Sequence, residues 1–290
     1  MTPNALAALN TTPAAFPHWH FHPDVWALVL LLAGAYAFAL RREKLKTGRP
    51  SARRGQMVAF GLGVGALLVA SEWPVHDLAE HYLYSVHMVQ HLTMTLVVAP
   101  LLLLGTPAWL ARRILSPKWL LRTVKAISRP VPNLVQANLV LVLMHWPLIV
   151  DATLRHHPLH FVAHAVLLAS ALILWLPVVS PLKEIPRLGP LAQMVYLFLQ
   201  TIVPTVPASF LTLGKGLLYP RYGTFPRLWG ISAITDQQLA GLIMKIGAGS
   251  FLWAVIITIF FRWYEREERK PRDVLLWDDV ERELTRLENS

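Results

Sequence analysis

The chain alternates long apolar runs with short polar segments, and the runs set its architecture. Each run is close to the ~20 residues that a helix needs to cross ~30 Å of hydrocarbon at 1.5 Å per residue. The pattern predicts an all-α integral membrane bundle of seven transmembrane helices. The predicted spans are 24–40, 56–73, 81–104, 133–150, 158–179, 190–213 and 237–261.

Composition supports the same class. The 290 residues are 54% hydrophobic and 15% charged, with a mean hydropathy of +0.44, whereas a soluble domain carries about 25% charged residues. The chain has no cysteine, which excludes disulfides, thiolate metal sites and iron–sulfur clusters. The net charge of +10 lies in short clusters between the apolar runs. That placement is typical of membrane topology, so we expect no nucleic-acid partner.

The basic clusters also predict an orientation. Of the 27 Lys and Arg residues, 22 fall after the first, third, fifth and seventh spans. By the positive-inside rule, the N-terminus is outside and the C-terminus is cytoplasmic. The predicted regions are an extracytoplasmic N-terminal segment (1–23), a seven-helix membrane domain (24–263) and a cytoplasmic amphipathic tail (264–290).

The twelve histidines all lie on the outer side of this topology, and none follows residue 164. Polar side chains inside a span are costly, so they indicate a functional site. Five histidines fall within spans: His87, His91, His145, His160 and His164. The others precede spans one, three and five or, for His81, stand at the first residue of span three: His18, His20, His22, His76, His81, His156 and His157.

Spacing makes some of these histidines candidate metal ligands. His87 and His91 are four residues apart and share a helical face, and His160 and His164 repeat this spacing. Two imidazoles one turn apart can bind one metal ion. The predicted ligands are therefore His87, His91, His160 and His164.

Other groups have predicted supporting roles. The auxiliary groups on the route to the site are His145, His76 and His81. Asp77, Glu80 and Asp151 are near enough in sequence to orient imidazoles from behind. The alternative for each membrane histidine is a hydrogen bond between helices. Lys245 lies inside the last span, where its charge needs a partner such as a carboxylate.

Histidine and methionine without cysteine, on an oxidising side of a membrane, suit copper, although zinc and iron also accept histidine. Haem is the competing cofactor, because His91 and either His164 or His145 could clamp it within the bundle. Three hypotheses follow: a copper-handling factor without enzymatic activity, a haem-binding electron carrier and a metal-free scaffold.

Five strings of residues together resemble the multi-spanning bacterial CtaG family of cytochrome c oxidase assembly proteins. They are His87-Met-Val-Gln-His91, His145-Trp-Pro, His160-Phe-Val-Ala-His164, Leu218-Tyr219-Pro-Arg-Tyr222 and Asp236-Gln237-Gln238-Leu-Ala-Gly241-Leu-Ile-Met244. The resemblance implies a role in forming active oxidase, by helping copper reach its copper centres. It also implies a place in the bacterial cytoplasmic (inner) membrane, with oxidase subunits and extracytoplasmic copper chaperones as partners.

Overall fold

A computed structural model describes residues 19–269 and 277–288, and within these ranges the chain is helical and has no strand. The all-α prediction is confirmed. The helices are α2 (Pro23–Thr47), α3 (Arg54–Ser71), α4 (Val75–His81), α5 (Tyr84–Leu92), η2 (Thr93–Val98), α6 (Ala99–Gly105), α7 (Ala108–Ile114), α8 (Lys118–Ile127), α9 (Pro130–Met144), α10 (Pro147–Arg155), α11 (His157–Val179), α12 (Pro190–Leu213), α13 (Pro220–Gly223), α14 (Ala233–Leu242), η3 (Ile243–Gly247), α15 (Ala248–Glu268) and α16 (Trp277–Glu288).

Six of the described helical segments are long and apolar enough to cross a membrane, and a bent pair makes up to seven. The bent pair is α9 and α10, which meet at 63°. The fourth predicted span, 133–150, is therefore not one straight helix. It breaks at His145-Trp146-Pro147, because a proline cannot continue the hydrogen-bond ladder of the preceding turn. Large apolar side chains such as Leu31 and Phe38 are exposed on the outside of the bundle, as is expected of a surface that faces lipid.

The segment before the third span also differs from the prediction. The predicted spans leave His76 outside any helix, but His76 and His81 both lie on α4, which follows Pro74. The helix restarts there because Pro74 ends the preceding backbone ladder while its own fixed φ suits a helix start. This places His76 on a short helix with its side chain buried.

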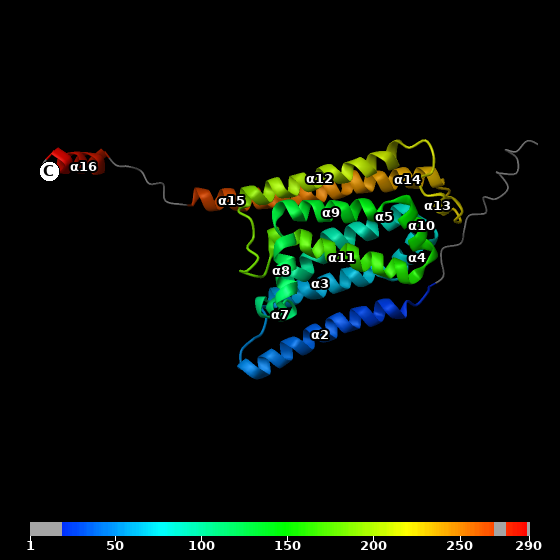
Figure 1. The fold of residues 1–290 in the computed structure, drawn as a ribbon, viewed down its shortest axis with the longest axis horizontal. Helices are drawn as coiled ribbons and strands as arrows, with labels where there is room; N and C mark the ends of the chain where they lie inside the picture. The colour runs from blue at the N-terminus through cyan, green and yellow to red at the C-terminus, as the bar shows by residue number, and fades with distance from the viewer. Residues whose placement is uncertain (1–18, 270–276, 289–290) are drawn as a thin grey trace, which may run out of the picture.

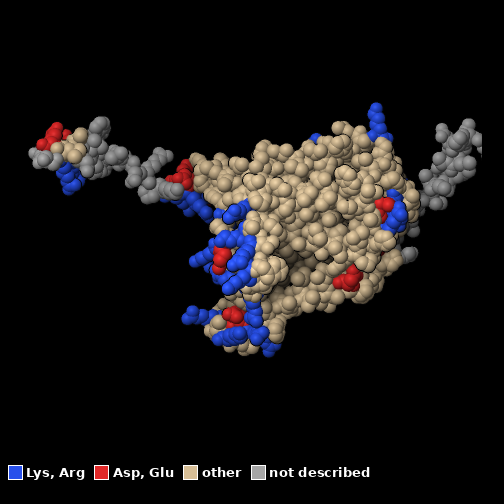
Figure 2. Space-filling model, in the orientation of Figure 1, with Lys and Arg blue, Asp and Glu red and all other residues tan. Residues whose placement is uncertain are grey.

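Figure 1 shows the helices running roughly side by side, with two different ends. One, the histidine end, is formed by α4, α10, α13 and the start of α5. The other, the basic end, is formed by α7, α8 and the C-terminal ends of α2 and α15. Figure 2 shows Lys and Arg gathered over the basic end and largely missing from the sides of the visible face. The charge pattern behind the predicted orientation is thus present in the folded chain.

The helices pack closely near the basic end. A Cβ built on Gly105 at the end of α6 would lie 2.5 Å from the backbone nitrogen of Phe60 on α3, so no larger residue fits without movement. The Tyr36 hydroxyl on α2 donates to the Gly105 carbonyl at 2.8 Å, and its ring stacks on Phe60. These contacts join α2, α3 and α6.

Two spans contain a π-helical turn at membrane depth. In the third span η2 follows α5 directly, and in the last span η3 follows α14. Short π segments of this kind occur at functional sites because they shift the phase of a helix. They begin two residues after His91 and two residues after Gly241, respectively.

The predicted tail starts at 264, but α15 continues to Glu268 and a separate helix, α16, occupies Trp277–Glu288. Residues 270–276 and 289–290 of that tail lie outside the described residues, as does most of the predicted 1–23 segment.

Candidate metal centre

The metal-ligating side chains lie at the histidine end, and their position depends on how α5 begins. The first backbone N–H groups of a helix have no partner within it. Here Asp236, on α14, accepts from the backbone N–H of Tyr84 at 2.7 Å and of Ser85 at 3.0 Å, and also from the Ser85 hydroxyl. Asp236 is fully buried. Its carboxylate therefore satisfies the start of α5 and fixes the helix that carries His87 and His91.

Three of the predicted ligands form a compact group. His87, His91 and His164 each offer one ring nitrogen, and the three atoms lie within 4.8 Å of one another. The Nε2 atoms of His91 and His164 are 3.1 Å apart, and the rings of His87 and His91 have centroids 4.2 Å apart. The face of α5 that carries His87 and His91 thus meets the side of α11 that carries His164, as the spacing predicted.

A void of about 10 Å³ lies among these rings. Its lining includes His87, His91, His164 and His160, the four predicted ligands, together with Met144. A cavity of this size is about that of one water molecule or one ion. The Nδ1 atoms of His87 and His91 and the Nε2 atom of His160 are buried and have no hydrogen-bond partner in the described chain. Unpartnered buried polar atoms are costly, so they favour a bound cation or water.

His145 stands at the bend between α9 and α10, beside this group. Its Nδ1 lies 2.7 Å from the Leu141 carbonyl. A carbonyl only accepts, so Nδ1 carries the proton and the lone pair of neutral His145 is on Nε2. That Nε2 atom is buried and, among the described residues, unpartnered, and the ring lies 5.9 Å from that of His91. His145 is therefore a fourth imidazole with its free lone pair inside the bundle.

A second group lies on α4 and α11. His76, Glu80 and His160 offer ligand atoms within 4.8 Å of one another. Glu80 Oε1 is 3.4 Å from His76 Nε2 and 3.0 Å from His160 Nδ1. The Gln90 amide contacts the other nitrogen of His76, Nδ1, at 3.2 Å. His160 was predicted with the first group, and its ring faces both.

Histidines that precede α2 reach the same region. His20 and His22 lie 3.4 and 3.5 Å from the two carboxylate oxygens of Asp77, and the His22 ring is 4.8 Å from the His76 ring. Asp77 Oδ2 and His22 Nε2 have no hydrogen-bond partner in the described chain, so the orienting role of Asp77 stays a prediction. Asp151 pairs instead with Arg155 at 2.6 Å.

The remaining predicted histidines are not brought together. His81 ends α4 with an exposed side chain and belongs to neither group. His156 and His157 are exposed at the start of α11, and His157 lies 3.9 Å from Asp24. His18 lies outside the described residues.

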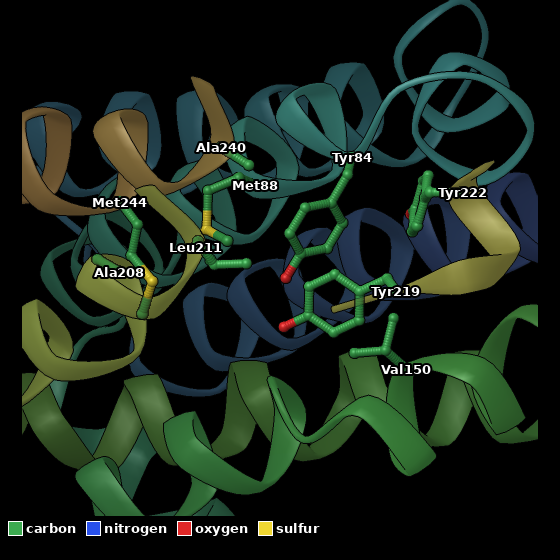
Figure 3. Close-up of a cluster of buried hydrophobic side chains, with 9 residues drawn as sticks. All are labelled: Tyr84, Met88, Val150, Ala208, Leu211, Tyr219, Tyr222, Ala240 and Met244. Atoms are coloured by element: carbon green, nitrogen blue, oxygen red, sulfur yellow. The ribbon is translucent and has the colours of Figure 1, made fainter. Parts of the chain in front are cut away.

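Three tyrosines belong to one cluster of buried side chains (Figure 3). Tyr84, Tyr219 and Tyr222 are all nearly fully buried. The Tyr219 hydroxyl donates to the His145 carbonyl at 2.8 Å, and the Tyr222 hydroxyl donates to the Ala79 carbonyl at 2.8 Å. Burial raises the pKa of Tyr219 to about 12, so its hydroxyl remains a donor at neutral pH. The cluster fixes the bend at His145 and the helix that carries His76.

Asp236 and these tyrosines have structural roles that the sequence alone did not predict, although they lie within the strings that carry the family resemblance. The available signal was an acidic residue beside an apolar span, which requires partners. Gln237 belongs to the same string and holds the preceding loop, since it accepts from the Leu218 backbone N–H at 2.7 Å and donates to the Gly216 carbonyl at 3.2 Å.

Lys245 lies in η3, where its side chain is exposed on the bundle. It lines a cavity of about 100 Å³ that also reaches His91 and His145. Within the described chain no carboxylate pairs with it, so the predicted partner is not found.

The fold and the site define a multi-pass helical membrane protein with a buried histidine cluster at one end. The chain belongs to the family of cytochrome c oxidase caa3 assembly factors (Caa3_CtaG), whose family model matches residues 34–266. Uncharacterized proteins of Mycobacterium leprae and Mycobacterium bovis are each 25% identical to it, over 88% and 87% of this chain. The chain spans 40% of the length of these relatives. No solved structure matches it.

Proposed function

We propose that this protein is a copper-handling factor in cytochrome c oxidase assembly, and that it is not an enzyme. In this proposal His87, His91 and His164 hold one copper ion as cargo for the oxidase, with His160 and His145 beside it. The basic end lies in the cytoplasm of a bacterium and the histidine end faces outward, as the positive-inside rule predicts. Oxidase subunits are then the acceptors and extracytoplasmic copper chaperones the donors.

The observation that carries the proposal is the group of three imidazoles around a void the size of one ion. Ring nitrogens bind metal ions at about 2.0–2.1 Å. Two nitrogens on a tetrahedral ion are then about 3.3 Å apart, and on a square-planar ion about 2.9 Å. The His91 and His164 Nε2 atoms, which share a hydrogen bond at 3.1 Å, already lie at a separation in this range. Little movement is needed to bind a metal ion.

The donor chemistry favours copper. Imidazole suits copper, zinc and iron, and the thioether of Met144 in the lining adds a soft donor that copper accepts. Copper(II) also binds such sites more tightly than the other divalent first-row ions. Membership of the caa3 oxidase assembly family supports the same choice, because forming active oxidase requires copper to reach its copper centres.

The geometry argues against haem between His91 and His164. Two imidazoles on opposite sides of a haem iron are about 4 Å apart, because each bond is about 2.0 Å long. His91 and His164 Nε2 are closer than this, and a void of about 10 Å³ holds no macrocycle.

The test is metal analysis of protein purified in detergent at neutral pH and exposed to copper. The wild type should retain copper, and a His87→Ala, His91→Ala double variant should lose the ion held by that group. His156→Gln is the matched control, since His156 is exposed at the same end, and it should bind as the wild type does. A colourless preparation that binds no copper contradicts the proposal, and a red one with a Soret band supports the haem carrier instead.

A test in cells addresses the alternative hypothesis that the protein is a metal-free scaffold. If the double variant accumulates normally in the membrane and the oxidase still acquires its copper, the histidines are dispensable and the protein acts as a metal-free scaffold.

A further inference from the structure

The group of His76, Glu80 and His160 differs from the three-histidine group in its chemistry. It includes a carboxylate, and two of its members come from α4, which carries no member of the other group. His76 and His160 are buried, and Glu80 is half-buried. A carboxylate held between two imidazoles below the surface is a donor set for a divalent cation.

The surroundings of this group are anionic. Glu72 and Asp77 are buried on either side of the α3–α4 junction. Neither oxygen of the Glu72 carboxylate has a hydrogen-bond partner in the described chain. In the same part of the chain no Lys or Arg pairs with Glu72, Asp77 or Glu80; the basic residues lie mainly at the opposite end. Buried carboxylates without a cation are costly, so this region favours the binding of one.

The ligand atoms of this group face one another, and a neighbouring amide contacts the His76 nitrogen that does not face Glu80. Gln90 contacts Nδ1 of His76, which leaves Nε2 toward Glu80. The contacting atom is the amide nitrogen, which donates to Nδ1 and so places the proton of neutral His76 on Nε2. The Gln90 carbonyl oxygen has no partner in the described chain, and turning the amide over would let it accept from Nδ1–H and free Nε2 for an ion. His160 Nδ1 lies 3.0 Å from Glu80 Oε1. One ion bound at about 2.0–2.2 Å from each atom fits this separation, once Nδ1 has given up any proton.

A cavity of about 260 Å³ connects the two groups. His76 and His160 line it from one group and His164 from the other, and Asp24 and His157 also line it. The rings of His160 and His164 are 4.2 Å apart on successive turns of α11. An ion bound at the carboxylate group is thus one helical turn from the three-histidine group, within the same cavity.

We propose that His76, Glu80 and His160 form a second metal site, which takes a divalent first-row cation and passes copper to His87, His91 and His164. The transfer part of this inference rests on the proposed function. It proceeds by ligand exchange: an imidazole of the inner group binds the ion as a ligand of the outer group leaves, and the ion keeps its charge. Among divalent ions copper(II) binds most tightly, in accord with the usual order of affinities.

Titration of the detergent-purified protein with copper(II) sulfate tests the second site. Bound copper is measured by mass spectrometry, and its ligands by electron paramagnetic resonance. The wild type should bind two ions per chain at saturation. Glu80→Gln, which keeps size and polarity, should bind one, and the resonance signal with oxygen ligation should disappear. Asp151→Asn is the matched control, because Asp151 lies at the same end in an ion pair outside both groups. It should bind two.

The two proposals can fail separately. If Glu80→Gln keeps two ions, there is no second site and Glu80 merely orients His160. The same conclusion follows if the wild type binds a single ion and the His87→Ala, His91→Ala variant loses it. The copper-handling proposal then still stands. If Glu80→Gln loses an ion while the His87→Ala, His91→Ala variant loses none, the second site stands and the three-histidine site fails. Circular dichroism of each variant checks that the bundle is folded.

Discussion

The two ends of the bundle place polar residues in opposite ways. At the basic end, α8 buries none of its residues, and its Lys and Arg side chains face outward. At the histidine end, the polar groups are buried: His76, His87, His91, His160 and Asp236 are each at most 6% exposed. Exposed charges interact weakly with the fold, whereas buried polar groups depend on every partner. Orientation in the membrane therefore tolerates change at one end, and the site at the other does not.

The backbone differs in the same way. The histidine end contains the short helix α4, the 63° bend at His145 and loops held by side chains. Each break leaves backbone groups that side chains must satisfy. The basic end joins longer helices through short amphipathic ones. The breaks bring imidazoles from α4, α5, α11 and the bend between α9 and α10 together, which straight helices alone would not do.

The largest effect is expected from Asp236. Replacing it with Ala leaves two backbone N–H groups and the Ser85 hydroxyl without their acceptor inside the bundle, and should cost about 3–5 kcal/mol of unfolding free energy. Asp236→Asn keeps one acceptor and should cost about 1–3 kcal/mol. Unfolding in detergent by titration with dodecyl sulfate, followed by tryptophan fluorescence, measures both. Asp151→Asn is the control, and equal stability of Asp236→Ala and wild type contradicts the role of Asp236.

The next effect falls near the basic end. Gly105→Ala places a Cβ within 2.5–2.6 Å of Phe60 and should cost about 1–3 kcal/mol through overpacking. Gly61→Ala on α3 meets nothing within 4 Å and should be neutral or up to about 1 kcal/mol stabilising. The same unfolding titration compares them. Copper binding by Gly105→Ala should stay normal; a loss of copper would show that the two ends are coupled.

Tyr219→Phe tests the support of the bend. It removes the hydroxyl that donates to the His145 carbonyl but keeps the buried ring, so about 1–2 kcal/mol of stability should be lost. Copper affinity should fall as well if the bend positions His145. Tyr264→Phe, whose hydroxyl donates to Glu268 on an exposed surface, provides the comparison and should change neither quantity.

The smallest effect is expected at the surface of the basic end, where Arg112 donates to Glu184 at 2.7 Å. The Arg112 guanidinium lowers the pKa of Glu184 from its usual value. A lowered pKa stabilises the fold above the ordinary carboxyl pKa, and this contribution is lost as pH falls through the folded value. Both side chains are exposed, so Glu184→Gln should leave unfolding at pH 7 unchanged. A clear loss at pH 7, absent near pH 3, would show that the pair matters more than solvent screening allows.

Much of this arrangement follows from the sequence. Apolar runs give the membrane helices, and the i, i+4 spacing of His87 with His91 and of His160 with His164 gives two faces that do meet. The clustering of the basic residues predicted a charged end, which Figure 2 shows. These features depend on local periodicity and composition, which a single sequence records directly.

The remainder depends on contacts between distant segments. That His160 faces Glu80 as well as His164 follows from the angle between α4 and α11, and no spacing rule gives that angle. Asp236 caps a helix more than 150 residues before it, so its partner could not be identified from neighbours. The break at His145-Trp146-Pro147 could have been anticipated from Pro147, but its angle could not.

The π turn η2 lies between two parts of the third span, α5 and α6, which have different roles. Each added residue rotates the downstream part of a helix by roughly 100° about the helix axis. Upstream of η2, the face of α5 is fixed by Asp236 and presents His87 and His91 to the cluster. Downstream, α6 presents Gly105 to Phe60. Deleting one residue within 93–98 would restore a regular helix, but the two faces could no longer be correct together. The turn sets the rotational phase between membrane anchor and histidine cluster.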